Sequence, residues 1–444
     1  MDTRIPTADI QKGIDDQLIC IQRSAFRYFE RQINPSNGLV PDKYAPDKPC
    51  AKDWPSSIAA VGFALATYPV AVARDFLSRD DAVQRTLTTL RFFLKSAHGP
   101  EVDATGYRGF YYHFLDMRTG RRTWQCELST IDTALLLSGM LTCAAFFARD
   151  VPEEVEIRSI VDTLYRRVEW DWALNGELTM SMGWKPESGF LRMRWKGYNE
   201  ALLLYLLALG SPTHPITEES YGSWTSGYEW KQIYGYDFLY AASLFTHQFP
   251  HIWIDFRGIQ DDFMREKGID YFENSRRATY VQRQYALTNP LDFCGYAANC
   301  WGLTASQGPG PKTVMIDGVT RRFWGYIARG VPYGPDDGTI APSAVVASLP
   351  FAPEIVLPAA DYFVNDLNLH DVNVYGFRTT FNPTYVAAHG QTAGWVSPWH
   401  FGINEGPVVL MIENHRNGLL WDLMHECPYL VIGLKRAGFR AARP

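Results

Sequence analysis

Residues 197–216 read GYNEALLLYLLALGSPTHPI, and they place a single acid, Glu200, in front of a long run of apolar residues. A helix without a polar face is typical of one that is buried on all sides. A carboxylate that opens such a helix loses contact with water, so we expect its pKa to rise into the range that suits a general acid. The plainer interpretation is a first-turn Glu that complements the helix dipole. The stretch makes Glu200 a candidate catalytic acid.

Helical periodicity continues on both sides of this stretch and covers most of the chain. We expect helices at 17–32, 57–73, 82–97, 129–148, 154–173, 198–209, 227–249, 263–287, 291–303, 342–349, 353–367, 401–414 and 419–424. Short connections alternate with long loops rich in Gly and aromatic residues, which favours helical hairpins arranged in a ring with the long loops at one end. A small β-hairpin is expected around 314–316 and 321–324. No linker or break in composition divides the chain, so we expect residues 1–444 to form a single domain.

The composition excludes several classes of protein. The chain has 444 residues, of which 46% are hydrophobic and 20% charged, and this describes a globular chain and not a disordered one. A net charge of −6 argues against a nucleic-acid binder, which usually needs a basic face. Aromatic residues make up 14% of the chain, and Trp and Tyr suit a wet groove that binds carbohydrate.

Signals for export, membrane insertion and metal binding are weak. The N-terminus has no apolar stretch typical of a signal peptide, so we expect either a cytoplasmic protein or one whose export signal has been removed. The longest uncharged run, 54–73, contains Pro and Gly and predicts a buried helix, not a membrane span. His247 and His251 have the spacing of a zinc pair, but Pro250 is expected to interrupt their helix, and we expect no metal.

Three further acids lie next to apolar runs. Glu127 and Asp132 bracket the segment ELSTID (127–132), and Asp132 lies one turn into the predicted helix, where it could instead serve only the helix N-terminus. Glu405 lies in FGINEGP (401–407). Clusters of Trp and Tyr precede or follow each of these acids. Paired carboxylates in an aromatic cleft are the chemistry of glycoside hydrolysis, in which one acid protonates the leaving oxygen and the other activates water or attacks the sugar.

Longer stretches of the sequence resemble one known family, the glycoamylase-like domain. The group includes bacterial β-1,2-glucanases of glycoside hydrolase family 144 and the transglycosylation domain of cyclic β-1,2-glucan synthases. The resemblance spans almost the whole chain, in order, at GLVPDKY (38–44), SSIAAVGFALATYP (56–69), GFYYHFLDMRTGRR (109–122), ELSTIDTALLLSG (127–139), GYNEALLLYLLALGSPTHPI (197–216), DGTIAPSA (337–344), YGFRTTFNPT (375–384) and INEGPVVLMIENHRNGLLW (403–421).

The resemblance implies an all-α fold, an (α/α)6 toroid, in agreement with the ring of helical hairpins. It also implies a β-1,2-linked glucan substrate, no metal or organic cofactor, and export to the periplasm. Glu200 matches the catalytic acid proposed for the family, and Asp132 matches a second acid by position. In the β-1,2-glucanases the stretch around Asp132 resembles the pattern D-x-x-E. This chain has Ser129 where that pattern has its first acid. Many relatives carry Asp where this chain has Asn404.

The leading hypothesis is an endo-type glycoside hydrolase that acts on β-1,2-glucan and sophorooligosaccharides. Glu200 would be the general acid, Asp132 or Glu127 the second carboxylate, and Glu405 an outside candidate. Sugar subsites are expected from Arg122, Trp184, Trp195, Tyr198, Asn199, His214, Trp230, Trp395 and Trp399. The alternatives are a transglycosylating or cyclising enzyme, an exo-acting glucosidase on another linkage, a polysaccharide lyase and a glucan-binding protein without activity. We expect a monomer that has no membrane span, binds no nucleic acid, and is periplasmic or secreted if its export signal was removed.

Overall fold

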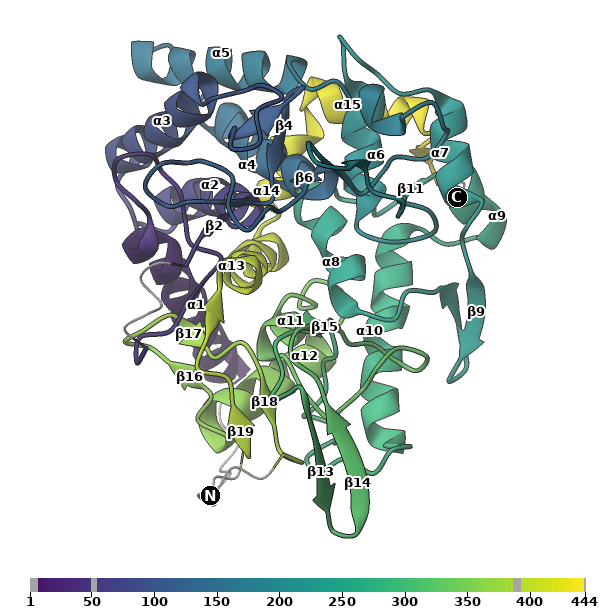
Figure 1. The fold of residues 1–444 in the computed structure, drawn as a ribbon. Coiled ribbons are helices and arrows are strands. Elements are labelled where there is room, and N and C mark those ends of the chain that lie inside the picture. Colours follow the sequence, from purple (N-terminus) through teal and green to yellow (C-terminus); the bar gives the residue numbers. More distant parts are fainter. Residues whose placement is uncertain (1–6, 49–53, 386–392, 443–444) are drawn as a thin grey trace.

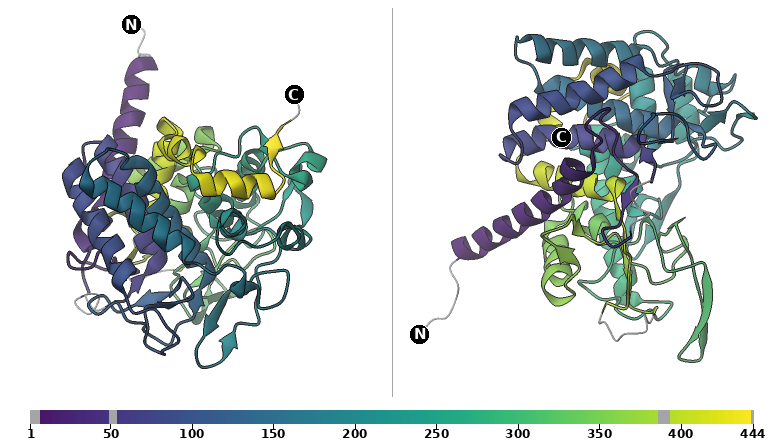
Figure 2. Two further views of the ribbon diagram at one scale, coloured as in Figure 1. Left: turned by 90° about the horizontal axis from the view of Figure 1, so that it is seen from above. Right: turned by 60° about the vertical axis from the view of Figure 1, so that its left-hand side comes forward.

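The computed structural model describes residues 7–48, 54–385 and 393–442, and nearly half of them lie in helices joined by long loops and short strands (Figure 1). Helix α1 (Thr7–Gln32) starts ten residues before the predicted segment, and its first turns extend beyond the rest of the molecule (Figure 2). Its inner face buries Leu18, Ile21, Phe26 and Phe29, as its periodicity predicts, and it packs on a helix near the C-terminus. No helix in the described parts of the chain is both long and apolar enough to cross a membrane.

One set of helices is apolar and buried on nearly every side. The set comprises α2 (Ile58–Ala73), α4 (Thr130–Phe146), α6 (Ala201–Gly210), α8 (Leu244–Trp253), α11 (Pro342–Val346) and α13 (Gly402–Arg416). All residues of α6 are buried, as expected for a helix without a polar face. Helices α2 and α4 approach so closely that a Cβ on Gly139 would lie 2.0 Å from the carbonyl oxygen of Gly62, so only Gly fits there. We refer to these six as the inner helices.

A second set of helices is buried on one side only, and most of its members pack against the inner helices. It comprises α3 (Arg79–Lys95), α5 (Pro152–Arg166), α7 (Glu218–Thr225), α9 (Asp262–Lys267), α10 (Tyr271–Thr288), α12 (Pro353–Asp361), α14 (Leu419–His425) and α15 (Pro428–Arg436). Helix α5 packs on α4, α15 on α6, α10 on α8 and α12 on α11, so inner and outer helices alternate along much of the chain. The outer helices α7 and α15 were not predicted from the sequence.

Short antiparallel strands connect the ends of the inner helices. A five-stranded sheet has the order β3 (Gly106–Tyr107), β4 (Phe110–Tyr112), β6 (Leu128–Ser129), β7 (Gly183–Lys185) and β8 (Gly189–Phe190). Strand β6 runs directly into α4. In the same way β2 (Ser56–Ser57), paired with β5 (Phe114–Leu115), leads into α2, and β20 (His400–Phe401), paired with β1 (Lys43–Tyr44), leads into α13. These pairings bring segments distant in the sequence to the N-terminal ends of the inner helices.

The remaining strands form two-stranded pairs. They are β9 (Trp230–Ile233) with β10 (Tyr236–Leu239), β11 (Ile259–Gln260) with β21 (Arg440–Ala441), β12 (Ala305–Ser306) with β15 (Ile327–Ala328), β13 (Lys312–Ile316) with β14 (Val319–Phe323), β16 (His370–Asp371) with β17 (Gly376–Phe377), and β18 (Phe381–Asn382) with β19 (Trp395–Val396). The β13–β14 pair confirms the predicted hairpin.

Two predicted helices were wrong. The first half of 227–249 is the β9–β10 hairpin, because Tyr234 and Gly235 both have positive φ (51° and 83°) and form the tight turn that suits antiparallel strands. The segment 291–303 is an irregular loop, since Asn289 ends α10 in the left-handed conformation and Pro290 follows it. Pro250, expected to interrupt its helix, instead lies inside α8, whose last turn is buried through Ile252 and Trp253.

A buried ion pair holds the loop between β14 and β15. The side chains of Arg329 and Asp337 are both fully buried, and Arg329 Nε and Nη2 donate to the two Asp337 carboxylate oxygens at 2.7 Å. Arg329 Nη1 also donates to the carbonyl oxygen of Ser306, and Asp337 accepts from the backbone N–H of Trp324. The pair therefore fixes a loop that reaches the cavity described below.

We expect Arg329→Met to lower the free energy of unfolding by about 3 kcal/mol, because it leaves the Asp337 carboxylate buried without its partner. Urea unfolding measures the loss. Arg91→Met is the matched control, since Arg91 pairs with Glu156 on the surface and such a pair contributes about 0–1 kcal/mol. Equal losses in the two variants would contradict the assignment.

Candidate active site

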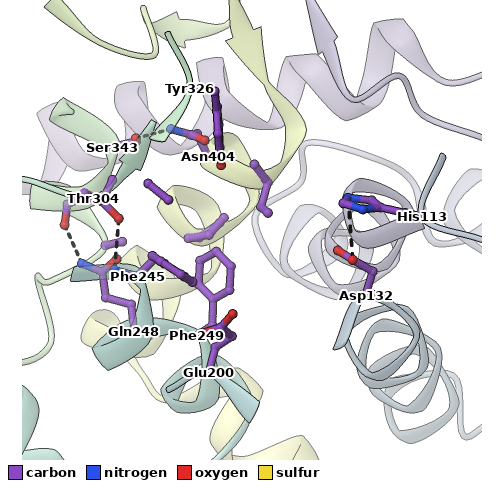
Figure 3. Close-up of a pocket in the computed structure, with 15 residues that line it drawn as sticks. His113, Asp132, Glu200, Phe245, Gln248, Phe249, Thr304, Tyr326, Ser343 and Asn404 are labelled. Carbon is purple, nitrogen blue, oxygen red and sulfur yellow. Dashed lines mark hydrogen bonds and ion pairs between the residues drawn. The ribbon is translucent and has the colours of Figure 1, made fainter. Parts of the chain in front are cut away.

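A cavity of about 280 Å³ opens where the N-terminal turns of several inner helices meet (Figure 3). It is lined by His113, Asp132, Glu200, Phe245, Gln248, Phe249, Thr304, Ala305, Tyr326, Ser343, Ala344, Ala347, Ile403, Asn404 and Pro407. These residues come from the first two turns of α4, α8 and α13, from α11 and the residue after it, from the residue before α6, from β12, and from the loops that hold His113, Thr304 and Tyr326. The N-terminus of a helix carries partial positive charge, so this end of the inner helices favours carboxylates.

Glu200 lies at the start of α6 and is one of the two carboxyl groups that line the cavity. Burial raises the pKa of this carboxyl from 4.5 to about 7, and the Asp132 carboxylate adds to the rise. The side chain of Phe249 lies beside Glu200 and supplies an apolar wall (Figure 3). A substantial fraction of Glu200 is therefore protonated at neutral pH, as the sequence led us to expect.

Asp132 lies in the first turn of α4 on another wall of the cavity (Figure 3). Ser129 caps this helix by accepting a hydrogen bond from the backbone N–H of Asp132 at 3.2 Å, and its hydroxyl donates to Asp132 Oδ2. Asp132 Oδ2 also lies 3.7 Å from His113 Nε2. The two interpretations of Asp132 are therefore compatible, because one side chain completes the helix N-terminus and lines the cavity.

His113 lies between two carboxylates. Its Nδ1 is 2.8 Å from Glu127 Oε1, and its Nε2 faces Asp132. Although burial alone would lower the pKa of His113, the Asp132, Glu127 and Asp42 carboxylates raise it to about 9. The imidazole is therefore positively charged at neutral pH. Burial alone would raise the pKa of Glu127. The hydrogen bond and the charge of His113 outweigh this effect of burial and hold the pKa of Glu127 below its ordinary value.

Asp42 is a third acid near Asp132 and was missed in the sequence. It lies immediately before β1, where its N–H donates to the Pro55 carbonyl at 2.8 Å and its carbonyl accepts from the N–H of Gly402 at 3.0 Å. Burial raises the pKa of Asp42 to about 6, although the His113 and Lys43 charges oppose the rise. A signal was present, because Asp42 is the only acid in GLVPDKY (38–44), one of the stretches on which the family resemblance rests.

Glu405 does not line the cavity. It is only 2% exposed on α13, and its carboxyl lies 3.4 Å from His400 Nδ1. Burial raises the pKa of Glu405 well above its ordinary value and lowers that of His400 to about 3, so both groups are neutral. The neighbouring Asn404 lines the cavity instead, and its amide donates to Ser343 Oγ at 3.0 Å.

The nine residues predicted as sugar subsites do not line this cavity. Arg122 is paired with Glu187, and Trp195 Nε1 donates to Thr130 Oγ1 at 2.9 Å. Tyr198 is buried against Tyr271, Asn199 accepts from the N–H of Ala201, and His214 lies 3.5 Å from Asp171. The remaining four are Trp184 beside Tyr107, Trp230 beside Phe263, Trp395 in β19 and Trp399 beside Trp54.

Several cavity residues carried no clear signal in the sequence. Gln248 donates to the Ala344 carbonyl at 2.6 Å and to Ser348 Oγ at 2.7 Å, so it ties α8 to α11. Tyr326 is 55% exposed, and its hydroxyl points into the cavity (Figure 3). Burial of that hydroxyl and the negative charges of Asp42, Asp132 and Glu200 raise the pKa of Tyr326.

The described residues contain no group of three or more His, Cys, Asp or Glu side chains that could hold a metal ion. His247 and His251 are both buried, and they lie at hydrogen-bonding distance from the Ala241 carbonyl and from Ser275 Oγ, respectively. Burial lowers the pKa of His247 to about 4 and that of His251 to about 3. The two imidazoles are neutral core residues.

The family model described as "Glycoamylase: Putative glucoamylase" matches residues 192–428. An exo β-1,2-glucooligosaccharide sophorohydrolase of Parabacteroides distasonis is 27% identical over 98% of this chain, and this chain spans only 60% of that protein. The structure is similar to that of an endo-β-1,2-glucanase from Chitinophaga pinensis in complex with sophorotriose and glucose, with a TM-score of 0.83, 26% identity and coverage of 96% of this chain and 99% of that one. A structure described as a putative glucoamylase from Bacteroides uniformis has a TM-score of 0.82 and 29% identity, and covers 96% of this chain and 98% of its own.

Proposed function

This chain belongs to the glycoamylase family, and on that premise we propose that it is a glycoside hydrolase that cleaves β-1,2-linked glucan. One observation carries the proposal: Glu200 and Asp132 line the same cavity in different electrostatic surroundings. Burial favours the protonated form of Glu200, whereas the positively charged imidazole of His113 faces the carboxylate of Asp132. An acid and a carboxylate in one cleft are the two groups that glycoside hydrolysis requires.

The roles follow from these surroundings. Glu200 donates its proton to the glycosidic oxygen as the bond to the sugar breaks. Asp132 accepts a proton from the attacking water or attacks the sugar itself, and His113 holds its charge in place. Glu127 is a positioning residue in this scheme, since its carboxylate is engaged by His113 and it does not line the cavity.

The β-1,2 linkage is supported by the relatives, because both the sophorohydrolase and the endo-β-1,2-glucanase act on that linkage by their descriptions. We favour endo action, since the structure of the endo-β-1,2-glucanase is similar over 96% of this chain, with a TM-score of 0.83. The alternation of inner and outer helices supports an (α/α)6 toroid formed by one domain. We also propose that the protein is a monomer, and that it is periplasmic or secreted if an export signal was removed and cytoplasmic otherwise.

Reducing-sugar release from a panel of linear β-1,2-, β-1,3-, β-1,4- and α-1,4-glucans tests this function. We expect release from the β-1,2-glucan alone, with sophorooligosaccharides of mixed length as early products. Release from the α-1,4-glucan alone would contradict the linkage and support a glucoamylase activity instead. Sophorose as the sole early product would contradict endo action.

We expect the activity to depend on pH through Glu200. The general acid must carry its proton, so kcat/KM falls as the pH rises through about 7. Initial rates across a pH series at constant ionic strength measure this fall. A rate that continues to rise above this pH would contradict the role of Glu200 as the acid.

A further inference from the structure

Four aromatic side chains outside the cavity form a continuous strip that starts at its wall. The strip consists of Phe114, Trp124, Trp54 and Trp399, and we call it the aromatic strip. The cavity residue His113 stacks on Phe114 with ring centroids 4.0 Å apart and planes tilted by 11°. From there the centroid separations are 5.2 Å to Trp124, 5.1 Å to Trp54 and 5.6 Å to Trp399.

Trp124 is the most exposed member of the strip and has an unusual backbone. It is 56% exposed, although large apolar side chains are usually covered. Its φ is 57°, and that of the next residue, Gln125, is 48°. Two successive residues other than Gly in the left-handed region are strained, and such strain is concentrated at functional sites. The strained turn holds an indole ring out into solvent.

Arg122 holds this turn in place. Its Nε donates to the Cys126 carbonyl at 2.6 Å, and its two terminal nitrogens donate to the Glu187 carboxylate at 2.6 and 3.0 Å. The N–H of Cys126 donates to the carbonyl of Thr123 at 3.1 Å and closes the turn around Trp124. The side chain of Arg122 is only 2% exposed. The hydrogen bonds of Arg122 therefore stabilise the turn that carries the exposed ring of Trp124.

Lys43 orients the other end of the strip. Its Nζ lies 4.1 Å from the ring centroid of Trp54 and 4.7 Å from that of Trp399. Cation–π contacts of this kind attract the ammonium group to the ring faces and restrict the two indoles. A surface that is already ordered loses little conformational entropy when a ligand binds.

We propose that the aromatic strip is a further sugar-binding subsite, which takes the glucosyl units of a glucan chain that extends beyond the cavity. The inference rests on the proposed function, because the ligand is the same glucan. The flat face of an indole matches the C–H face of a pyranose ring, while the sugar hydroxyls stay in water at its edges. A chain that leaves the cavity past His113 meets Phe114 first and then Trp124.

Calorimetric titration of the Glu200→Gln variant tests the inference without turnover. The ligands are linear β-1,2-glucan and the disaccharide sophorose, and Trp124→Ala is added to the variant. We expect Trp124→Ala to weaken binding of the polymer about tenfold, and binding of sophorose less than about twofold. Tyr234→Ala is the matched control, since Tyr234 is also an exposed aromatic residue at positive φ (51°), in the β9–β10 turn. It is expected to leave the affinity for both ligands unchanged.

The outcomes separate the two proposals. Binding of the polymer that Trp124→Ala does not change, or that Tyr234→Ala weakens as much, would overturn the subsite while leaving the proposed function intact. Failure of the Glu200→Gln protein to bind either β-1,2-linked ligand would contradict the proposed function itself, and the strip would then have no glucan to bind.

Discussion

Replacement of Glu200 by Gln is expected to lower kcat on linear β-1,2-glucan by about 10²–10⁴-fold, the usual contribution of a general acid. The amide has nearly the same shape as the carboxyl group and cannot donate the proton that the leaving oxygen needs. Initial rates of reducing-sugar release measure the loss. Glu156→Gln, at an exposed position of α5, is the matched control and should retain wild-type activity.

The stability of the same variant distinguishes a catalytic defect from a folding defect. The pKa of Glu200 in the folded protein, about 7, lies above its ordinary value of 4.5. The folded state therefore binds this proton more tightly than the unfolded chain, and wild-type stability decreases as the pH rises from 4.5 through 7. Glu200→Gln removes that decrease, so the variant should be at least as stable as the wild type above pH 7. Activity lost together with stability would contradict this explanation.

Replacement of Asp132 by Asn is expected to produce a loss of similar size, about 10²–10⁴-fold in kcat, because no second carboxylate then lines the cavity. The pH dependence of the remaining activity should also change. The Asp132 charge contributes to the raised pKa of Glu200, so its removal lowers that pKa, and the rate of the variant then falls at a lower pH than that of the wild type. A rate–pH series on a concentrated sample of the variant measures both effects.

Ser129→Ala separates the catalytic role of Asp132 from its capping role. Ser129 accepts the hydrogen bond that caps α4, and its loss should cost about 1 kcal/mol of stability. The carboxylate of Asp132 and its contact with His113 remain, so the rate should fall far less than in Asp132→Asn. Equal losses of activity in the two variants would indicate that Asp132 acts only through the helix N-terminus.

The two acids at the centre of the site could be predicted because their signal is local. Glu200 and Asp132 each stand at the start of an apolar run within one short window of sequence, and helix formation then places each at an N-terminal end. Glu405 has the same signal but is buried beside His400 instead, and its helix α13 contributes Ile403, Asn404 and Pro407 to the cavity.

Other members of the site depend on contacts between distant segments. Asp42 is placed by the pairing of β1 with β20, and His113 by the sheet that joins β4 to β6 and by its contact with Glu127. The two partners of each contact lie too far apart in the sequence for one short segment to reveal that they meet. Arg122 was expected to bind sugar. Its side chain instead donates to Glu187, which lies between β7 and β8, and to the carbonyl of Cys126, so it stabilises the turn at Trp124.

The fold was predictable to a similar degree. The apolar inner helices α2, α4, α6 and α13 follow from periodicity and hydrophobicity, since each is long and buried. The hairpin at 230–239 was missed because its strands are rich in aromatic residues, whose pattern in a short segment fits a helix as well. Only the turn at Tyr234 and Gly235 distinguishes the two.

Product analysis of linear β-1,2-glucan, incubated in parallel with the wild type and with Glu200→Gln, tests the central claim most directly. Chromatography with proton NMR identifies the linkage, the length and the anomeric form of what is released. We expect β-1,2-linked oligosaccharides from the wild type and almost none from the variant in the same time. Equal yields of the same products from both proteins would contradict the claim that Glu200 in this cavity cleaves the glucan.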